Sequence, residues 1–241
     1  MSFLSKKDKI IFGIYTAIML GIYITFLILD ISNDFHMDMP SIWIKFVSII
    51  ATTTFTLYLF IDSIIQKEDL LVRGFGLLAS ILTLVSDVFL LLLNDHYMAG
   101  IIVFSIAHMA TGARICLSCP NKRLFALSLS FRILALIAAF IFLSISETAD
   151  QKIVSLAVFY ITNLIMNFVI SLEQSIIISR LNRILLTIGL FLFIMCDVFV
   201  GLAFIWQDKP LYYVMSWIFY LPCQYLIAIS LKRKTDQCCI K

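Results

Sequence analysis

Long apolar runs separated by short polar segments dominate the chain. Crossing the hydrocarbon core of a bilayer takes about 20 residues of helix, and eight runs reach that length. They cover roughly 10–29, 42–65, 70–93, 97–118, 124–145, 153–172, 183–205 and 211–231. The runs are continuous, whereas the strands of an outer-membrane barrel alternate at every second residue. The pattern therefore predicts an all-α, polytopic membrane protein, in which a bundle of eight transmembrane helices forms a single domain over residues 1–241.

Composition and connection length support this prediction. Of the 241 residues 62% are hydrophobic and 14% are charged, outside the usual range of soluble domains. The connections are short, so consecutive helices should be antiparallel neighbours.

The first run follows a lysine-rich start, but it is longer than a signal-peptide core and lacks a small-residue cleavage site, which favours a retained span. The six cysteines lie in spans or on the predicted cytoplasmic side, and free thiols are expected.

Lysine and arginine are distributed unequally between the two sets of loops. The even-numbered loops, the termini and their flanks hold fourteen of these residues, whereas the odd-numbered loops hold only Lys152 and Lys209. Cytoplasmic loops are the ones enriched in Lys and Arg, so both termini are predicted to face the cytoplasm. The net charge of +3 is thus a topology signal, and nucleic acid is not an expected partner.

Two aspartates interrupt apolar runs in matching settings. Asp87 lies in "LVSDVFLLLL" and Asp197 in "IMCDVFVG". The repeated Asp-Val-Phe places the third and seventh spans in corresponding positions, which suggests a parallel four-plus-four internal repeat. An ionisable group at a helix centre costs about 2.5–3.5 kcal/mol on insertion scales, so such groups face the bundle interior and are often functional.

Polar side chains recur at helical spacing on four spans, so that each of these helices has one polar stripe. The stripes are Ser80, Thr83 and Asp87; Ser105, His108 and Gly112; Tyr160, Asn163 and Asn167; and Ser216, Tyr220 and Gln224. They fit either interhelical hydrogen bonding alone or a site assembled around the aspartates. Structural alternatives also remain for single residues. The aspartates fit an ion pair with Arg132 or Lys45, Lys45 fits an interfacial position, and His108 fits simple packing.

Paired carboxylates in a low-dielectric interior suggest acid–base chemistry. Burial and mutual repulsion both disfavour two charges, so Asp87 and Asp197 are expected to share one proton near neutral pH. Such a pair supplies a general acid and a general base or cation stabiliser. HExxH, GxSxG and P-loop motifs and paired CxxC motifs are absent, which argues against zinc proteolysis, serine acyl transfer and nucleotide hydrolysis. No metal is expected, because only the two aspartates and His108 are available as strong ligands.

Three segments resemble the YhhN-like lysoplasmalogenase family. In Gly76–Ile115, a span ending in an aspartate leads through a short loop to an aromatic residue, then Gly, Phe and His; the matching positions are Asp87, Tyr97, Gly100, Phe104 and His108. Ile188–Phe204 resembles the family's second aspartate span. Val214–Leu231 resembles its last span, where Tyr220 and Gln224 match. Ser86, Cys196 and Thr111 depart from the commoner family residues.

This resemblance implies hydrolysis of the vinyl ether bond of lysoplasmalogens, without a cofactor. The lysophospholipid would yield a fatty aldehyde and a glycerophospho-base, with Asp87 and Asp197 as catalytic residues. Polar residues near them are expected to bind the substrate: Lys45, His108, Tyr160, Asn163, Tyr220 and Gln224. The alternative is a proton-coupled transporter of lipids or small molecules, in which the aspartates are proton sites.

Overall fold

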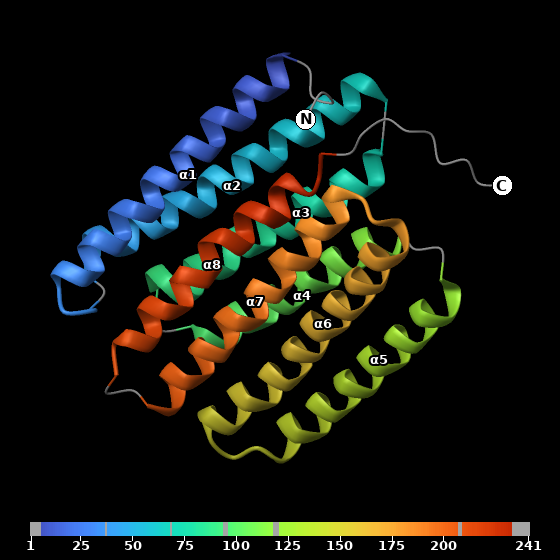
Figure 1. The fold of residues 1–241 in the computed structure, drawn as a ribbon. Helices are drawn as coiled ribbons and strands as arrows, with labels where there is room; N and C mark the ends of the chain where they lie inside the picture. Colours follow the sequence, from blue (N-terminus) through green and yellow to red (C-terminus); the bar gives the residue numbers. More distant parts are fainter. Residues whose placement is uncertain are drawn as a thin grey trace.

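The computed structural model describes residues 6–36, 38–67, 69–93, 96–117, 121–206 and 209–232. Its elements (Figure 1) are α1 (Lys6–Ser32), α2 (Met39–Gln66), α3 (Leu70–Asp87), the π-helix η1 (Val88–Leu93), α4 (Tyr97–Cys116), α5 (Lys122–Ile145), α6 (Ala149–Ile178), α7 (Leu181–Ile205) and α8 (Leu211–Ile229). The eight predicted spans are confirmed: α3 and η1 together make one of eight segments long and apolar enough to cross a membrane. The chain is therefore a multi-pass membrane protein.

Local capping groups set several helix ends. Asp38 precedes α2, and its carboxylate accepts a hydrogen bond from the backbone N–H of Ser41. A capping box formed by Thr148 and Gln151 starts α6. Such side chains satisfy backbone N–H groups that have no partner within the helix. The first predicted loop is shorter than expected, because α1 continues to Ser32 and includes Asp30.

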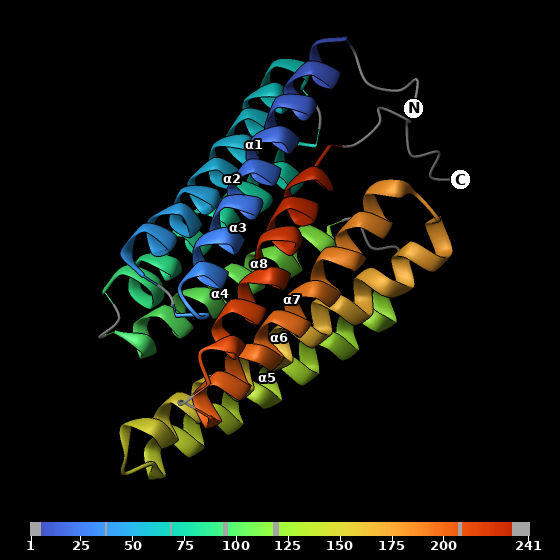
Figure 2. The same ribbon diagram turned by 60° about the vertical axis from the view of Figure 1, so that its left-hand side comes forward.

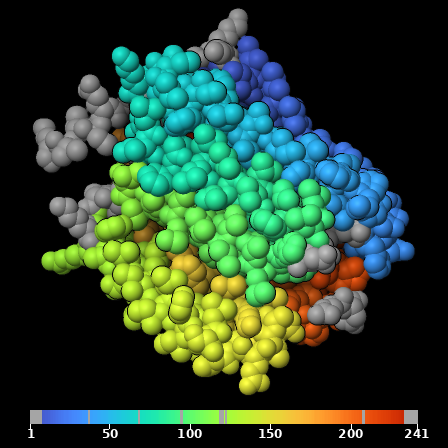
Figure 3. Space-filling model, turned by 180° about the vertical axis from the view of Figure 1, so that it is seen from behind, coloured from blue at the N-terminus to red at the C-terminus, as the bar shows by residue number. Residues whose placement is uncertain are grey.

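The helices pack in an order that resembles a repeat. α3 packs against α2 and α4, and α7 packs against α6 and α8; α1 and α5 are outer helices beside α2 and α6. Figures 1 and 2 show α1 and α5 on opposite sides of the bundle. The face drawn in Figure 3 runs from α1 and α2 across α3 and α4 to α5. Neighbours in the first four spans thus correspond to those in the last four; the four-plus-four repeat stays a prediction, because consecutive helices pack together in any antiparallel bundle.

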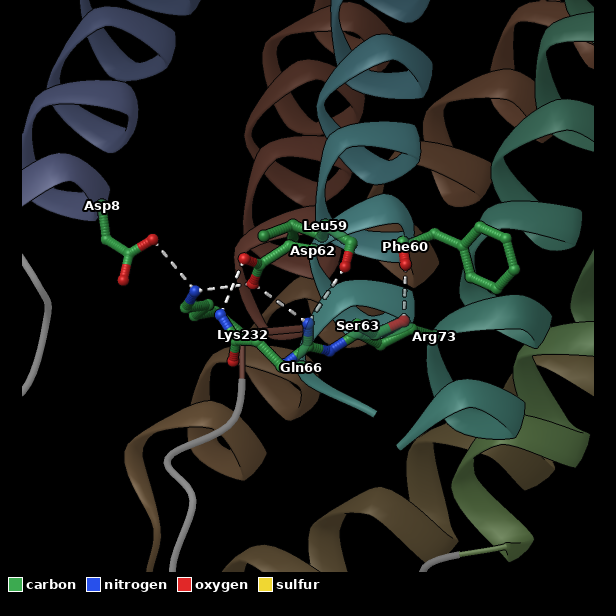
Figure 4. Close-up of polar contacts among 8 residues, drawn as sticks. All are labelled: Asp8, Leu59, Phe60, Asp62, Ser63, Gln66, Arg73 and Lys232. Atoms are coloured by element: carbon green, nitrogen blue, oxygen red, sulfur yellow. Dashed lines mark hydrogen bonds and ion pairs between the residues drawn. The ribbon is translucent and has the colours of Figure 1, made fainter. Parts of the chain in front are cut away.

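An ionic cluster joins four helices at the end of the bundle where α1 begins and α8 ends, which we call the basic end (Figure 4). Lys232, just beyond α8, contacts Asp8 on α1 at 3.0 Å and Asp62 on α2 at 3.1 Å. Asp62 also pairs with Arg73 on α3 at 3.3 Å. The beginning of α1 and the end of α8 are thus fastened at one end, which agrees with the predicted topology.

Asp62→Asn should destabilise the protein more than Asp8→Asn. Asp62 faces two cations, whereas Asp8 pairs with one of them. Since hydrogen bonds to charged groups contribute about 1.5–3 kcal/mol each, loss of the Asp62 charge should lower the free energy of unfolding by about that amount. Thermal unfolding in one detergent tests this expectation. Equal melting temperatures for the two variants would contradict it.

Candidate functional site

Asp87 lies where α3 changes into η1. The carboxylate is 5% exposed, and the Tyr220 hydroxyl on α8 donates a hydrogen bond to its Oδ2 at 2.6 Å. The next six residues form a π-helix. This conformation is rare in proteins, and where it occurs it is often at a functional site. The sequence pattern gave no sign of it, because six consecutive apolar residues fit either kind of helix.

Asp197 on α7 has a similar partner from a different helix. The Tyr160 hydroxyl on α6 donates to Asp197 Oδ2 at 2.6 Å. Asp197 is half-buried, whereas Asp87 is buried. The tyrosines come from helices that do not correspond in the repeat, since α8 serves α3 and α6 serves α7. The two halves have therefore different polar partners despite their similar packing.

An aromatic cluster, which comprises Phe104, His108, Tyr160, Phe193 and Tyr220, connects the two carboxylates. Phe104 lies 5.8 Å from Tyr160 and 6.5 Å from Tyr220, measured between ring centroids. Phe193 lies 4.8 Å from His108 and 5.6 Å from Tyr220. Each aspartate is thus bonded to a tyrosine of the same apolar cluster. The interior position predicted for the stripes with Asp87, His108 and Tyr220 agrees with this arrangement.

The structure does not support an ion pair at either aspartate. In the described part of the chain, the tyrosine hydroxyl is the only hydrogen-bond partner of each carboxylate, and neither carboxylate forms a salt bridge. The same residues provide no hydrogen bond between Asp87 and Asp197. Asp87 and Asp197 are therefore two separate groups that border one cluster, each with its own tyrosine partner, and their sharing of one proton stays a prediction.

Lys45 has a different position from the one expected. Its Nζ pairs with Asp30 Oδ2 at 2.6 Å, and both side chains are 0% exposed. The hydroxyl of Ser41 donates to the same carboxylate. The ammonium also lies 5.6 Å from the ring centroid of Trp217, which packs against Tyr220. Lys45 thus neither reaches the interface nor binds an aspartate of the site, and its pairing with Asp30 leaves it poorly placed for a substrate phosphate.

Asn163 is also occupied by a protein partner. Arg132 on α5 donates to Asn163 Oδ1 at 2.8 Å and to Asn167 Oδ1 at 2.6 Å. Asn167 in turn donates to the backbone carbonyl of His108 at 2.8 Å. A Cβ at Gly112 would lie only 2.7 Å from Asn167 Oδ1, so this glycine leaves space for the network. These residues connect α4, α5 and α6, which fits the structural alternative for the α6 stripe.

His108 and Gln224 differ from the other predicted binding residues, because they have polar atoms without partners. Both ring nitrogens of His108 and Nε2 of Gln224 are buried and make no hydrogen bond within the described residues. Both side chains line one cavity between α2, α3, α4, α7 and α8.

Of the eight predicted site residues, the structure brings five together at one cluster: Asp87, Asp197, His108, Tyr160 and Tyr220. It places Gln224 one turn from Tyr220.

Sequence reasoning missed Phe193 and Trp217. Phe193 lies four residues before Asp197 on α7, which puts the two side chains on one helix face. The same spacing separates Phe104 from His108 on α4. A search for aromatic residues one turn away from polar residues in spans would have found Phe193.

For the hydrolysis expected from the sequence, Tyr220→Phe and Tyr160→Phe should each reduce turnover while keeping the fold. Each change removes the hydroxyl that fixes one carboxylate oxygen, at 2.6 Å in both cases, and leaves the aromatic packing intact. Since a mispositioned catalytic group can lose as much as about 100-fold in rate, we expect a loss of about 10-fold or more in kcat. Steady-state kinetics with a lysoplasmalogen substrate measures this. Unchanged kcat in both variants would mean that the tyrosines do not position the acids.

Comparison with known proteins gives the family but no individual relative. Neither a curated protein nor a solved structure matches the chain. A model of the YhhN family matches residues 41–231, a region that contains both aspartates, both tyrosines and the cavity. Because this match covers most of the sequence, the chain belongs to the YhhN family.

Proposed function

We propose that the protein is a membrane-embedded hydrolase that cleaves the vinyl ether bond of lysoplasmalogens. One observation is the main support: two buried or half-buried carboxylates, each held by a tyrosine hydroxyl, border one aromatic cluster inside a bundle. Family membership agrees with this activity. The products would be a fatty aldehyde and a glycerophospho-base.

The reaction needs a proton on carbon and a water molecule. One aspartic acid gives its proton to the vinyl carbon farther from the ether oxygen. The π electrons of the double bond form the new C–H bond, and a lone pair of the ether oxygen stabilises the other carbon as an oxocarbenium ion. The other carboxylate takes a proton from water while the water oxygen bonds to the cationic carbon. The hemiacetal hydroxyl then loses its proton as the bond to the glycerol oxygen breaks, and the glycerol oxygen gains a proton, which leaves the aldehyde. The proton taken from water returns through solvent to the aspartate that acted as the acid. This use of two carboxylates around an oxocarbenium-like state parallels glycoside hydrolysis.

The surroundings of the carboxylates suit these steps. Each tyrosine binds one carboxylate oxygen, Oδ2, which leaves Oδ1 for proton transfer. Aromatic faces attract cations, so Phe104 and Phe193 would stabilise the oxocarbenium ion. Lys45 and Asn163 have protein partners and are not needed for this role. Gln224 and His108 retain polar atoms for a substrate or for water.

The packing order supports one other candidate, a proton-coupled transporter. Corresponding neighbours in the two halves are usual in carriers that work by movement of one repeat against the other. In that case the aspartates would bind and release protons and no bond in the substrate would change. Uptake into proteoliposomes driven by a pH gradient would identify this function.

Product analysis separates the two candidates. Purified protein is incubated with 1-alkenyl lysophosphatidylcholine and lysophosphatidylethanolamine, and long-chain aldehyde is measured by mass spectrometry. The 1-alkyl analogues, which have a saturated ether, are the matched control, because they cannot form an oxocarbenium ion by protonation. We expect aldehyde only from the alkenyl substrates. Folded protein that releases no aldehyde from either would rule out the proposed function.

A further inference from the structure

A narrow cavity with many hydroxyl groups lies in the middle of the bundle. Its volume is about 30 Å³, enough for about two water molecules, since one requires about 10–15 Å³. Five hydroxyl side chains line it: Thr52, Thr56, Ser80, Thr83 and Thr111. Hydroxyl groups both donate and accept hydrogen bonds, so this part of the wall suits water, whereas residues such as Leu190 and Phe193 make the rest of it apolar.

Two residues of the wall carry three unpaired polar atoms, which indicates an occupant that can hydrogen-bond. They are both ring nitrogens of His108, a residue that is 4% exposed, and Nε2 of Gln224, a residue that is 6% exposed. A buried polar atom without a partner costs about 1–3 kcal/mol, and ordered water is the usual remedy. A neutral imidazole offers one donor and one acceptor, which matches water.

A second cavity continues toward the basic end. It has a volume of about 20 Å³, and it shares Arg114 and Leu231 with the first cavity. Asn182, near the start of α7, and Ser230, after α8, line its far side. The Leu231 side chain lines both spaces and packs closely against Gly76, where a Cβ would lie 2.4 Å from Leu231 Cδ2.

The first cavity ends one helical turn from the Asp87–Tyr220 pair. Thr83 precedes Asp87 by four residues on α3, and Gln224 follows Tyr220 by four residues on α8. Four residues of helix rise about 6 Å. The cavity residue one turn before Asp197 is Phe193, which is apolar, whereas the one before Asp87 is Thr83, which carries a hydroxyl group.

We propose that these two cavities bind the water co-substrate and conduct it from the basic end to Asp87, with Leu231 as the constriction. This inference rests on the proposed function and assigns roles to the two acids. Asp87 accepts a proton from the water that attacks the oxocarbenium ion, and Asp197 protonates the vinyl carbon. His108 and Gln224 hold the waiting water by hydrogen bonds.

Silver-ion access to introduced cysteines tests the route. Thr56→Cys places a thiol in the cavity wall, and Thr54→Cys places one two residues away on the exposed side of α2. Silver is added from one side of oriented vesicles, remaining thiols are alkylated, and each cysteine is quantified by mass spectrometry. Hydrocarbon excludes ions, so Thr56→Cys should react at least about 10-fold faster than Thr54→Cys when silver is added at the basic end.

The same samples give the functional result. Silver should abolish aldehyde release by Thr56→Cys and leave that of Thr54→Cys at the level of the treated unsubstituted protein. Cys223, which is 0% exposed, should stay unmodified in folded protein, and Thr111→Cys on α4 supplies a second cavity position. Equal reaction of Thr54→Cys and Thr56→Cys, reaction only from the opposite side, or full modification of Thr56→Cys without loss of hydrolysis would overturn the proposal. Access without aldehyde release by any sample would instead refute the proposed function alone.

Discussion

Replacing either Asp87 or Asp197 by asparagine should lower the turnover of lysoplasmalogen hydrolysis by about 100-fold or more, the range typical of lost general acid–base catalysis. Asparagine fits the same space and still accepts the tyrosine hydrogen bond, but it neither delivers a proton nor balances a cation. The rate of aldehyde release under substrate saturation measures the effect. Asp34→Asn, at an exposed residue after α1, is the control and should retain full activity.

Stability separates a catalytic role of these aspartates from a structural one. Neither carboxylate faces a counter-charge among the described residues, so its removal leaves no unmatched cation. Loss of an ionisable group from a membrane interior often relieves a cost, and the melting temperatures should therefore stay constant or rise. Near-normal hydrolysis combined with a much lower melting temperature would show that the aspartates hold the helices together.

Lys45→Met should destabilise the protein by about 3–5 kcal/mol, the range for removal of one member of a buried ion pair. The carboxylate of Asp30 would remain inside the bundle with Ser41 as its one remaining hydrogen-bond partner among the described residues. The free energy of unfolding in detergent measures the loss. Lys209→Met, at an exposed position before α8, serves as the control and should have little effect.

A double variant tests whether the Lys45 effect arises from the unmatched charge. Asp30→Asn combined with Lys45→Met removes both charges, so the stability should return toward that of the unsubstituted protein. If Lys45 instead binds the substrate phosphate, Lys45→Met would raise KM strongly and leave unfolding unchanged. That outcome would restore the role expected from the sequence and contradict the buried pair.

The fold was predictable because its signal is repeated along the chain. Eight apolar runs define eight helices, and α3 with η1 covers the predicted segment 70–93. Asp30 shows the limit of this reasoning. The first predicted span, 10–29, ends just before this charged residue. Its contacts with Lys45 and Ser41 satisfy the carboxylate inside the bundle, so α1 continues past it.

The site was only partly predictable. The stripes identified which faces turn inward, since helical spacing fixes the face on which a side chain lies. The pairing of Tyr220 with Asp87 and of Tyr160 with Asp197 depends on which helices become neighbours and at what height, and no local pattern encodes that. The same reason hid the cavity, because its hydroxyl side chains are four threonines and one serine spread over three of the five helices that line it. The absence of a partner for His108 and Gln224 is likewise a property of the packed bundle.

Hydrolysis in D₂O tests the central claim most directly. The proposed chemistry places a solvent-derived proton on the vinyl carbon farther from the oxygen, which becomes carbon 2 of the aldehyde. Purified protein and 1-alkenyl lysophospholipid in D₂O should therefore yield aldehyde with one deuterium at carbon 2, and its formation should be about 100-fold slower with Asp197→Asn. Authentic aldehyde incubated with the protein in D₂O controls for later exchange. Aldehyde without deuterium at carbon 2, or no aldehyde from folded protein, would contradict the account.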